Sequence, residues 1–222
     1  MEEDLKAFRR LSDILDTLRK ECPWDRKQTM KSLRYLTIEE VHELGEAIVA
    51  LETEPPKPEA TDTTTSNLKK ELGDLAMHIL FYCKLAEEQG LFSTADVYNA
   101  ISDKLISRHP FIYDKEHYHG EGWEEIKMRE RDRHGVLDGV PDSLPSLVKA
   151  IRMQEKVAGI EHQSPVTTLP LDDLKHFHDP DHPTEQEVGD LLFGLVDWAR
   201  QHGINADDAL CGANRRFRQN HK

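Results

Sequence analysis

Apolar side chains recur every three to four residues along most of this chain of 222 residues. Near the N-terminus the pattern runs through Phe8, Leu11, Ile14, Leu15 and Leu18. Residues at this spacing lie on one side of an α-helix, whereas the side chains of a strand alternate with a period of about two. The periodicity therefore predicts an all-α fold, in which helices bury their apolar faces against one another.

Breaks in this pattern predict where the helices end. Residues 53–66 are rich in Pro, Thr and acidic residues and have no apolar period, so we expect a loop there. In the helix before this loop, the expected core positions are Leu33, Leu36, Val41, Leu44 and Ile48. The helices of the N-terminal part are expected at about residues 3–20, 30–51, 67–89, 93–107 and 121–134.

The C-terminal part repeats a pattern of the N-terminal part in shortened form. Glu71-Leu-Gly-Asp74 and Glu187-Val-Gly-Asp190 each begin an apolar helix that ends before a glycine. We interpret this similarity as a duplicated helical domain whose second copy is degenerate. The sequence thus predicts a complete helical domain at residues 1–134, a linker at 135–145 and the degenerate copy at 146–222.

Acidic residues outnumber basic ones, 42 to 29, and the formal net charge is −13. A protein that binds duplex nucleic acid needs a basic surface, so this class of function is excluded for the chain as a whole. No apolar run of about 18 residues is present and the first residues do not resemble a signal peptide, so we expect no membrane span. The three widely spaced cysteines fit a reducing compartment, and the cytoplasm is the expected location.

Acidic side chains gather at two places in the sequence. On a helix, Glu39 and Glu40 lie one turn before Glu43, and Glu71 lies one turn before Asp74. If the two helices pack antiparallel, these carboxylates converge, and they repel one another unless a cation binds between them. Hard divalent ions such as Mg²⁺ prefer oxygen ligands, so the pattern favours a metal site over a solvated acidic face.

Basic side chains with the same helical spacing follow later in the chain. Lys104 and Arg108 are one turn apart, as are Lys127 and Arg131, and Trp123 lies one turn before Lys127. Arginine and lysine bind phosphate oxygens, and a tryptophan ring stacks on a nucleotide base. Together with the acidic cluster, these residues indicate a site for a metal-bound nucleotide polyphosphate. The chain has no P-loop motif, which excludes a P-loop NTPase.

Five blocks of sequence, taken in order, resemble one known family. They are CPWDRKQT (22–29), EEVHE (39–43), ELGDL (71–75), NAISDKLISRHP (99–110) and WEEIKMRER (123–131). The chain resembles the MazG family, within the all-α NTP pyrophosphatase group, over about residues 3–134 and more weakly over 185–220. The resemblance implies the helical bundle of that group, hydrolysis of nucleoside triphosphates to nucleoside monophosphate and pyrophosphate, and assembly as a homodimer or a higher homo-oligomer.

The resemblance also implies roles for individual residues, with Mg²⁺ as the cofactor and Mn²⁺ as the alternative. The metal ligands would be Glu40, Glu43, Glu71 and Asp74, and Glu39 would assist the metal shell or orient the attacking water. The phosphates would be bound by Lys104, Arg108 and Lys127, with Trp123 and Arg131 beside the nucleotide.

The second copy departs from this pattern. No EExxE motif precedes Glu187, and the chain offers only Leu171-Asp172-Asp173-Leu174 in its place. We therefore expect the C-terminal copy to be inactive or much weakened. The run from His176 to His182 has no standard metal-site spacing and favours a solvated loop.

Two other functions remain open from the residues alone. A di-iron carboxylate bundle takes a Glu-x-x-His from each of two helices, but only Glu39 and His42 have this spacing here. A non-catalytic module that senses nucleotides or binds a partner would explain the degenerate second half. Against that second alternative, the first acidic cluster is intact.

Overall fold

The structure is a computed structural model that describes residues 2–53, 63–128, 135–161 and 183–221. Every regular element within these ranges is a helix, which confirms the predicted all-α class. The chain divides into two compact units, Met1–Leu105 and Ile106–Lys222. None of the described helices has both the length and the apolar character needed to cross a bilayer.

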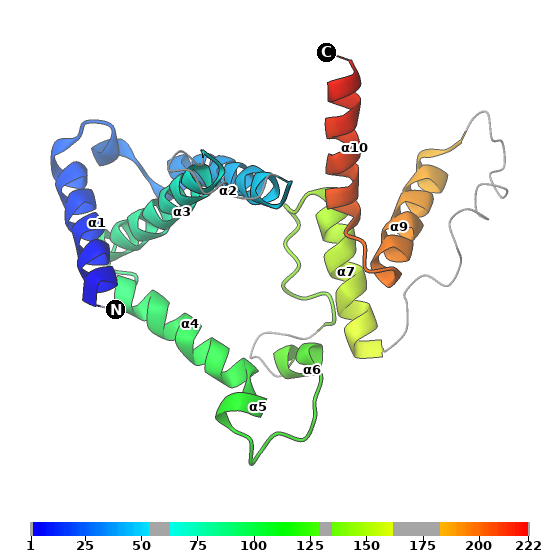
Figure 1. The fold of residues 1–222 in the computed structure, drawn as a ribbon. Coiled ribbons are helices and arrows are strands. Elements are labelled where there is room, and N and C mark those ends of the chain that lie inside the picture. The colour runs from blue at the N-terminus through cyan, green and yellow to red at the C-terminus, as the bar shows by residue number, and fades with distance from the viewer. Residues whose placement is uncertain (1, 54–62, 129–134, 162–182, 222) are drawn as a thin grey trace. The chain divides into compact units, whose positions relative to one another are not determined.

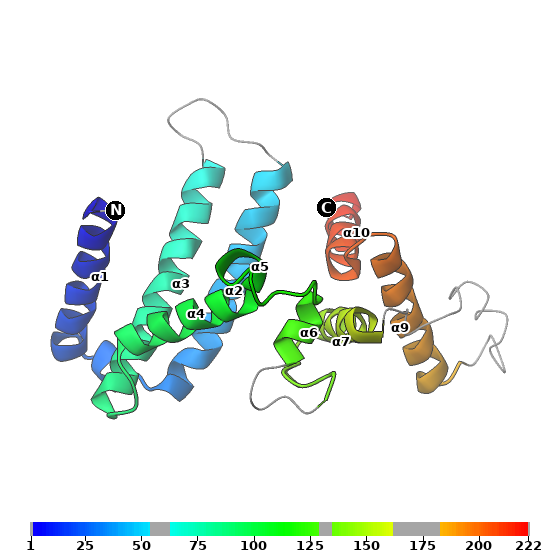
Figure 2. The same ribbon diagram turned by 90° about the horizontal axis from the view of Figure 1, so that it is seen from below.

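The first unit is built around a pair of long helices. α2 covers Met30–Thr53 and α3 covers Thr63–Glu88, and both views draw them side by side and antiparallel (Figures 1 and 2). α1 (Glu2–Glu21) contacts α3, and the short helix η1 (Asp25–Lys27) follows α1. α4 (Thr94–Arg108) begins in this unit and extends past its end. These bounds confirm the first four predicted helices to within a few residues.

The sequence predicts the start of α4 more closely than the start of α3. α3 begins at Thr63, so residues 63–66 belong to its first turn and not to the predicted loop. A first turn tolerates such polar residues because its N–H groups lack partners within the helix. Ser93 caps α4, since its hydroxyl accepts the Asp96 N–H at 3.2 Å and the Asp96 carboxylate accepts the Ser93 N–H at 2.8 Å.

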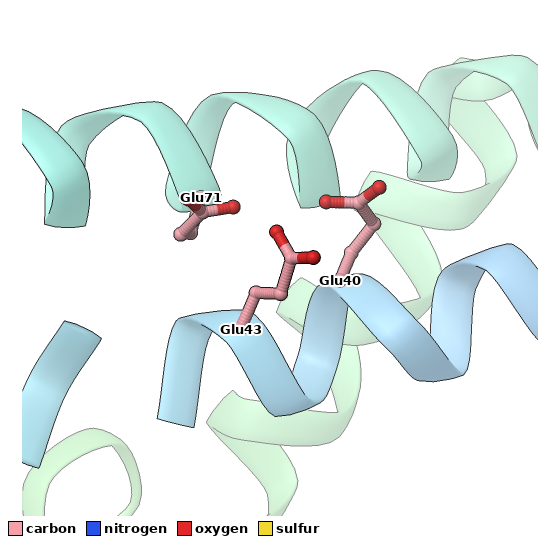
Figure 3. A group of neighbouring side chains, drawn as sticks. All are labelled: Glu40, Glu43 and Glu71. Atoms are coloured by element: carbon pink, nitrogen blue, oxygen red, sulfur yellow. The ribbon is translucent and has the colours of Figure 1, made fainter. Parts of the chain in front are cut away.

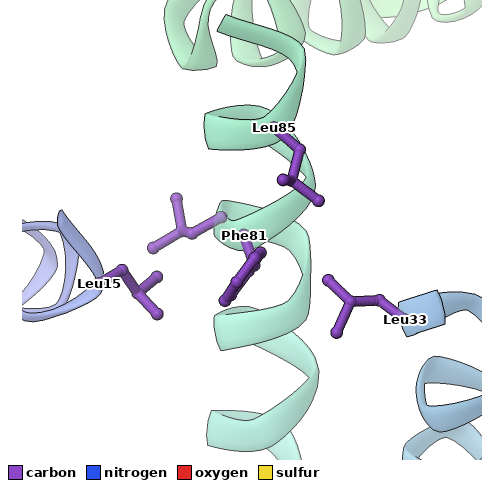
Figure 4. Close-up of a cluster of buried hydrophobic side chains, with 5 residues drawn as sticks. Leu15, Leu33, Phe81 and Leu85 are labelled. Carbon is purple, nitrogen blue, oxygen red and sulfur yellow. The ribbon is translucent and has the colours of Figure 1, made fainter. Parts of the chain in front are cut away.

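The core of the first unit forms where α1 and α2 pack on opposite sides of α3 (Figure 4). Its members are no more than 3% exposed: Leu15 from α1, Leu33 from α2, and Leu80, Phe81 and Leu85 from α3. Each fully buried side chain of this size contributes about 1.5–3 kcal/mol through the hydrophobic effect. The core therefore fixes the middle and C-terminal half of α3 against both neighbouring helices.

Arg19 of α1 forms hydrogen bonds with the end of α3 and with η1. Its guanidinium donates two hydrogen bonds to the Glu88 carboxylate, each of 2.8 Å, at the C-terminus of α3. It also donates to the backbone carbonyls of Asp25 and Gln28, which lie in and after η1. A planar guanidinium can make all these bonds at once, so a single side chain orders the turn that leads into α2.

Only part of the predicted apolar face of α2 is covered within this unit. Leu33 is buried and Leu36 packs against the core, as expected. Val41 and Ile48 are 50% and 44% exposed, so the prediction that they lie in the core of this unit is wrong. The reason is geometric: the apolar residues of α2 spread around more of the helix than α3 alone can cover.

The second unit has α7 at its centre. α7 contacts α6, α9 and α10, and the buried Gln154 side chain of α7 donates to the Phe193 carbonyl of α9 at 2.8 Å. The helices of this unit are α5 (Pro110–Tyr113), α6 (Trp123–Met128), α7 (Ser146–Glu161), α9 (Glu185–Gln201) and α10 (Ala206–Asn220).

The connection between the two predicted domains lies within this unit. α6 confirms the helix expected at 121–134 as far as Met128, and the remainder of that range lies outside the described residues. Residues 135–145, the predicted linker, form turns and no helix. The domain boundary proposed there stays a prediction.

Candidate metal centre and nucleotide-binding residues

The antiparallel packing of α2 and α3 brings acidic side chains of the two helices together. Glu40 and Glu43 extend from α2 and Glu71 from α3, into the space between the helices (Figure 3). One carboxylate oxygen from each lies within 4.8 Å of the other two. Within the part of the chain that the structure describes, this is the group of acidic, His or Cys side chains that could hold a metal ion.

The electrostatics of this acidic cluster (Glu40, Glu43 and Glu71) disfavour full ionisation. The pKa of Glu40 is raised, first because burial disfavours the charged form and then because of nearby negative charges, that of Asp74 foremost. The pKa of Glu43 is raised chiefly by a hydrogen bond with Glu71 that favours the protonated acid, and then by the Glu71 charge. A cation between these groups would remove the repulsion.

Glu71 is the most buried member of this cluster. Its side chain is 8% exposed, and its buried Oε2 has no hydrogen-bond partner among the described residues. Lys70 Nζ lies 3.1 Å from Glu71 Oε1 and 3.8 Å from Asp74, but the lysine is 65% exposed and offsets the negative charge only in part. Carboxylate oxygens with a buried, unsatisfied acceptor match the donor set of a hard divalent cation.

The other two acidic residues singled out from the sequence lie at the edge of this cluster. Asp74 is half-buried one turn after Glu71, and its charge acts on Glu40. Glu39 is exposed one turn before Glu43, and its charge contributes to the raised pKa of Glu43. Neither belongs to the group whose oxygens lie within 4.8 Å of one another.

Three of the predicted nucleotide-binding residues form a group in the second unit. The guanidinium of Arg108 and the ammonium of Lys127 each lie 5.9 Å from the centre of the Trp123 ring. This distance is that of a cation–π contact. Lys104 is exposed in the part of α4 that belongs to the first unit. Arg131 lies outside the described residues.

Lys127 is held by a buried ionic group that the sequence did not predict. Its Nζ donates to Glu124 at 2.8 Å, and Lys156 Nζ of α7 lies 3.7 Å from the other oxygen of the same carboxylate. Lys127 is 6% and Lys156 3% exposed. Lys156 also donates to the Val136 carbonyl at 3.2 Å. Because Lys156 is distant in sequence from Glu124, no local spacing could have indicated this contact.

The Glu-x-x-Asp motif of the second half has a different role in the structure. Thr184 is the N-cap of α9, and Glu187 completes a capping box with it. The Glu187 carboxylate accepts the Thr184 N–H at 2.7 Å, while the Thr184 hydroxyl accepts the Glu187 N–H at 3.2 Å. This carboxylate therefore stabilises the start of a helix. The stretches 171–174 and 176–182 lie outside the described residues.

A polar network near the acidic cluster was also missed. Thr37 of α2 contacts both His78 and Tyr82 of α3, each at 2.8 Å. A signal for it was present, because Thr37 precedes Glu40 by one turn and His78 follows Asp74 by one turn. Single polar residues within an apolar stripe are common, however, and the sequence does not say which of them meet.

Comparison with known protein families identifies the segment that carries the acidic cluster. The sequence profile of the MazG nucleotide pyrophosphohydrolase domain matches residues 28–113. This segment contains α2, α3 and α4, and with them the acidic cluster, Lys104 and Arg108.

Similarity to individual proteins extends over nearly the whole chain. A nucleoside triphosphate pyrophosphohydrolase of Escherichia coli (strain K12) is 34% identical over 233 residues, which cover 94% of this chain and 83% of that protein. The nucleoside triphosphate pyrophosphohydrolase/pyrophosphatase MazG of Thermotoga maritima is 33% identical over 229 residues, which cover 98% of this chain and 85% of that protein. A nucleoside triphosphate pyrophosphohydrolase of Mycobacterium tuberculosis is 31% identical over 64% of this chain and 42% of its own length. The chain therefore belongs to the MazG family of nucleoside triphosphate pyrophosphohydrolases.

Proposed function

We propose that the chain hydrolyses nucleoside triphosphates at the bond between the α and β phosphates, releasing a nucleoside monophosphate and pyrophosphate. The proposed cofactor is Mg²⁺, held by Glu40, Glu43, Glu71 and Asp74, with Mn²⁺ as a substitute. The observation that carries the proposal is the buried Glu71 Oε2, which has no partner among the described residues and faces two carboxylates with raised pKa values.

The chemistry divides between the ion and the protein. A bound divalent ion would neutralise charge on the triphosphate and lower the pKa of the attacking water. Phosphoryl chemistry otherwise needs positioning and charge stabilisation more than covalent help. The acidic cluster supplies the positioning, because it comes from two helices fixed by a common core. Glu39, exposed beside Glu43, would assist the metal shell or orient the water.

Nucleotide binding is proposed for the basic residues and for Trp123. Lys104, Arg108 and Lys127 would neutralise phosphate charge, Trp123 would contact the base, and Arg131 would assist. The cation–π contacts of Arg108 and Lys127 with Trp123 support a common role for these three. Lys127 is buried and hydrogen-bonded to Glu124, which would lower the entropy cost of using it as a fixed charge.

Two further proposals concern the organisation of the protein. We propose that residues 146–222 are a degenerate second copy of the first domain without a metal site of their own, which agrees with the use of Glu187 as a helix cap. We also propose a homodimer, supported by exposed apolar residues on α2 and α3, among them Val41, Ile48 and Leu72.

A product analysis tests the proposed reaction. The purified chain is incubated with a panel of NTPs and dNTPs, with Mg²⁺ or with EDTA, and the products are separated by ion-exchange chromatography. We expect NMP and pyrophosphate only with the metal, and neither from Glu43→Gln. Formation of NDP and orthophosphate would contradict cleavage at the α–β bond. Metal-dependent nucleotide binding without turnover would instead support the non-catalytic sensing module.

A further inference from the structure

We propose that Thr37, His78 and Tyr82 are positioning residues that fix α2 against α3 in the register at which the acidic cluster can bind its ion. This inference rests on the proposed metal site. It adds residues that would not touch the ion or the substrate and would act only through the carboxylates.

The three side chains form a compact network in which His78 is buried and Thr37 and Tyr82 are half-buried. Thr37 Oγ1 lies 2.8 Å from His78 Nδ1 and 2.8 Å from the Tyr82 hydroxyl, and it donates to the Leu33 carbonyl at 3.0 Å. His78 is 4% exposed, and burial lowers its pKa, so the neutral ring is favoured. The proximity of Asp74 raises the pKa of His78 but is the smaller effect.

One assignment of hydrogens satisfies all of these groups. A threonine hydroxyl has one hydrogen to donate and two lone pairs that accept. With its hydrogen on the Leu33 carbonyl, Thr37 accepts one hydrogen bond from neutral His78 Nδ1–H and one from the Tyr82 hydroxyl. Thr37 then uses its full hydrogen-bonding capacity, with both acceptor positions directed at α3. The network therefore has one preferred geometry.

The position of the network is what connects it to the metal site. Because α2 and α3 are antiparallel, residues later in α2 contact residues earlier in α3. Thr37 contacts His78. Glu43, which follows Thr37 in α2, contacts Glu71, which precedes His78 in α3. The network thus lies between the acidic cluster and the apolar core around Leu33 and Phe81.

Register matters more for metal binding than for apolar packing. A slip of one residue moves a helix by about 1.5 Å along its axis, whereas metal–ligand distances must be met to within about 0.2 Å. Leucine and phenylalanine contacts resist small slips weakly, because they are not directional. Hydrogen bonds at 2.8 Å are directional, and a slip would leave buried polar groups without partners. The network therefore suits the task of holding Glu71 opposite Glu40 and Glu43.

The test is a titration of the full chain with Mn²⁺, in which the EPR signal of the free ion measures how much metal is bound. Thr37→Val removes the hydroxyl but keeps the shape, and we expect Mn²⁺ affinity to weaken by about tenfold, the loss typical of a residue behind a metal ligand. Thr37→Ser keeps the hydroxyl and should restore affinity to within about threefold of the wild type. Tyr82→Phe removes one hydrogen bond only, and it should weaken affinity even if Thr37→Val fails to fold.

A control separates positioning from stability. Leu85→Ala opens a cavity far along α3 from Glu71 and should lower the melting temperature, yet it should leave Mn²⁺ affinity unchanged. In kinetics, Thr37→Val should raise the Mg²⁺ concentration needed for half-maximal rate, while kcat at saturating Mg²⁺ stays within about threefold of the wild type.

Two results would overturn the inference: the first would also contradict the metal site, and the second would contradict only the positioning role. If Glu71→Gln binds Mn²⁺ as tightly as the wild type, the metal site itself is wrong and the positioning role falls with it. If Glu71→Gln loses binding while Thr37→Val and Tyr82→Phe keep wild-type affinity, the metal site stands and only the positioning role is wrong.

Discussion

α3 and α9 carry the same Glu-x-x-Asp spacing, yet the two glutamates do different things. Glu71 lies in the third turn of α3, is buried, and faces two carboxylates of α2. Glu187 lies in the first turn of α9 and accepts hydrogen bonds from its own N-cap residue. Asp74 is half-buried beside the acidic cluster, whereas Asp190 is exposed.

The difference shows that a motif becomes a site only through the element that packs against it. In the first turn of a helix, free N–H groups stabilise a carboxylate at once. In the third turn those N–H groups are already bonded within the helix, so Glu71 must find its compensation elsewhere. α2 supplies more negative charge, which Lys70 offsets only in part, so the compensation for Glu71 would come from the proposed metal ion.

The largest effect on activity is expected when Glu71 and Glu187 are each replaced in separate variants. Glu71→Gln should lower kcat/KM more than about 100-fold, since the loss of a ligand exceeds the loss of a residue behind one. Glu187→Ala should leave kcat/KM within about twofold of the wild type but cost roughly 1 kcal/mol of stability through the lost cap. Steady-state kinetics and thermal melting measure both. Equal losses of activity in the two variants would contradict the distinction.

The acidic cluster should also make metal binding depend on pH. Because the pKa values of Glu40 and Glu43 are raised, protons compete with the ion at pH values above the ordinary range of a carboxyl group. Mn²⁺ affinity should therefore weaken by about tenfold or more between pH 7 and pH 5. Titrations at several pH values measure this, with Glu187→Ala as the control that keeps the same profile. An affinity independent of pH in this range would argue against ligation by these groups.

Metal binding should stabilise the first unit. A ligand at about 100 times its dissociation constant stabilises the folded state by about 2.7 kcal/mol, provided that it does not bind the unfolded chain. Addition of Mg²⁺ should therefore raise the melting temperature of the wild type and of Glu187→Ala, but not that of Glu71→Gln. Calorimetry with and without EDTA checks this. The same shift in all three proteins would indicate a site elsewhere.

The smallest effect should appear in the metal-free protein. The pKa of Glu43 is raised in the folded state, so its contribution to stability is present below the pKa of the unfolded chain and is lost as pH rises through the folded value. At pH 7 the cluster is therefore under repulsion, and Glu43→Gln should raise the melting temperature in EDTA by a few degrees while abolishing the response to Mg²⁺. Glu185→Gln, in the first turn of α9, should not raise it. A lower melting temperature for Glu43→Gln in EDTA would contradict the repulsion.

Much of the fold follows from periodicity, and the failures have a common origin. The spacing of apolar residues predicts α1, α2 and α4 closely, because helical geometry alone fixes which residues share a face. It does not say how wide a face a neighbour will cover, and Val41 and Ile48 are exposed for that reason. α3 begins a few residues before the predicted start because its polar first turn has no apolar period.

The contacts of the candidate site also differ in how well the sequence predicts them. The spacing of Glu40, Glu43 and Glu71 predicts their meeting once two helices are assumed antiparallel, and the structure brings them together. The Thr37 network and the contact of Lys156 with Glu124 depend on side chains that are distant in sequence and have no repeated pattern. Such contacts are set by packing, which sequence spacing does not specify.

The most direct test of the central claim is to count Mn²⁺ ions bound by the wild type, by Glu71→Gln and by Asp190→Asn, using EPR titration of the full chain. We predict tight binding to the wild type and to Asp190→Asn, and its loss in Glu71→Gln. Retention of tight binding in Glu71→Gln, or its loss in Asp190→Asn, would contradict the assignment of the metal site to α2 and α3.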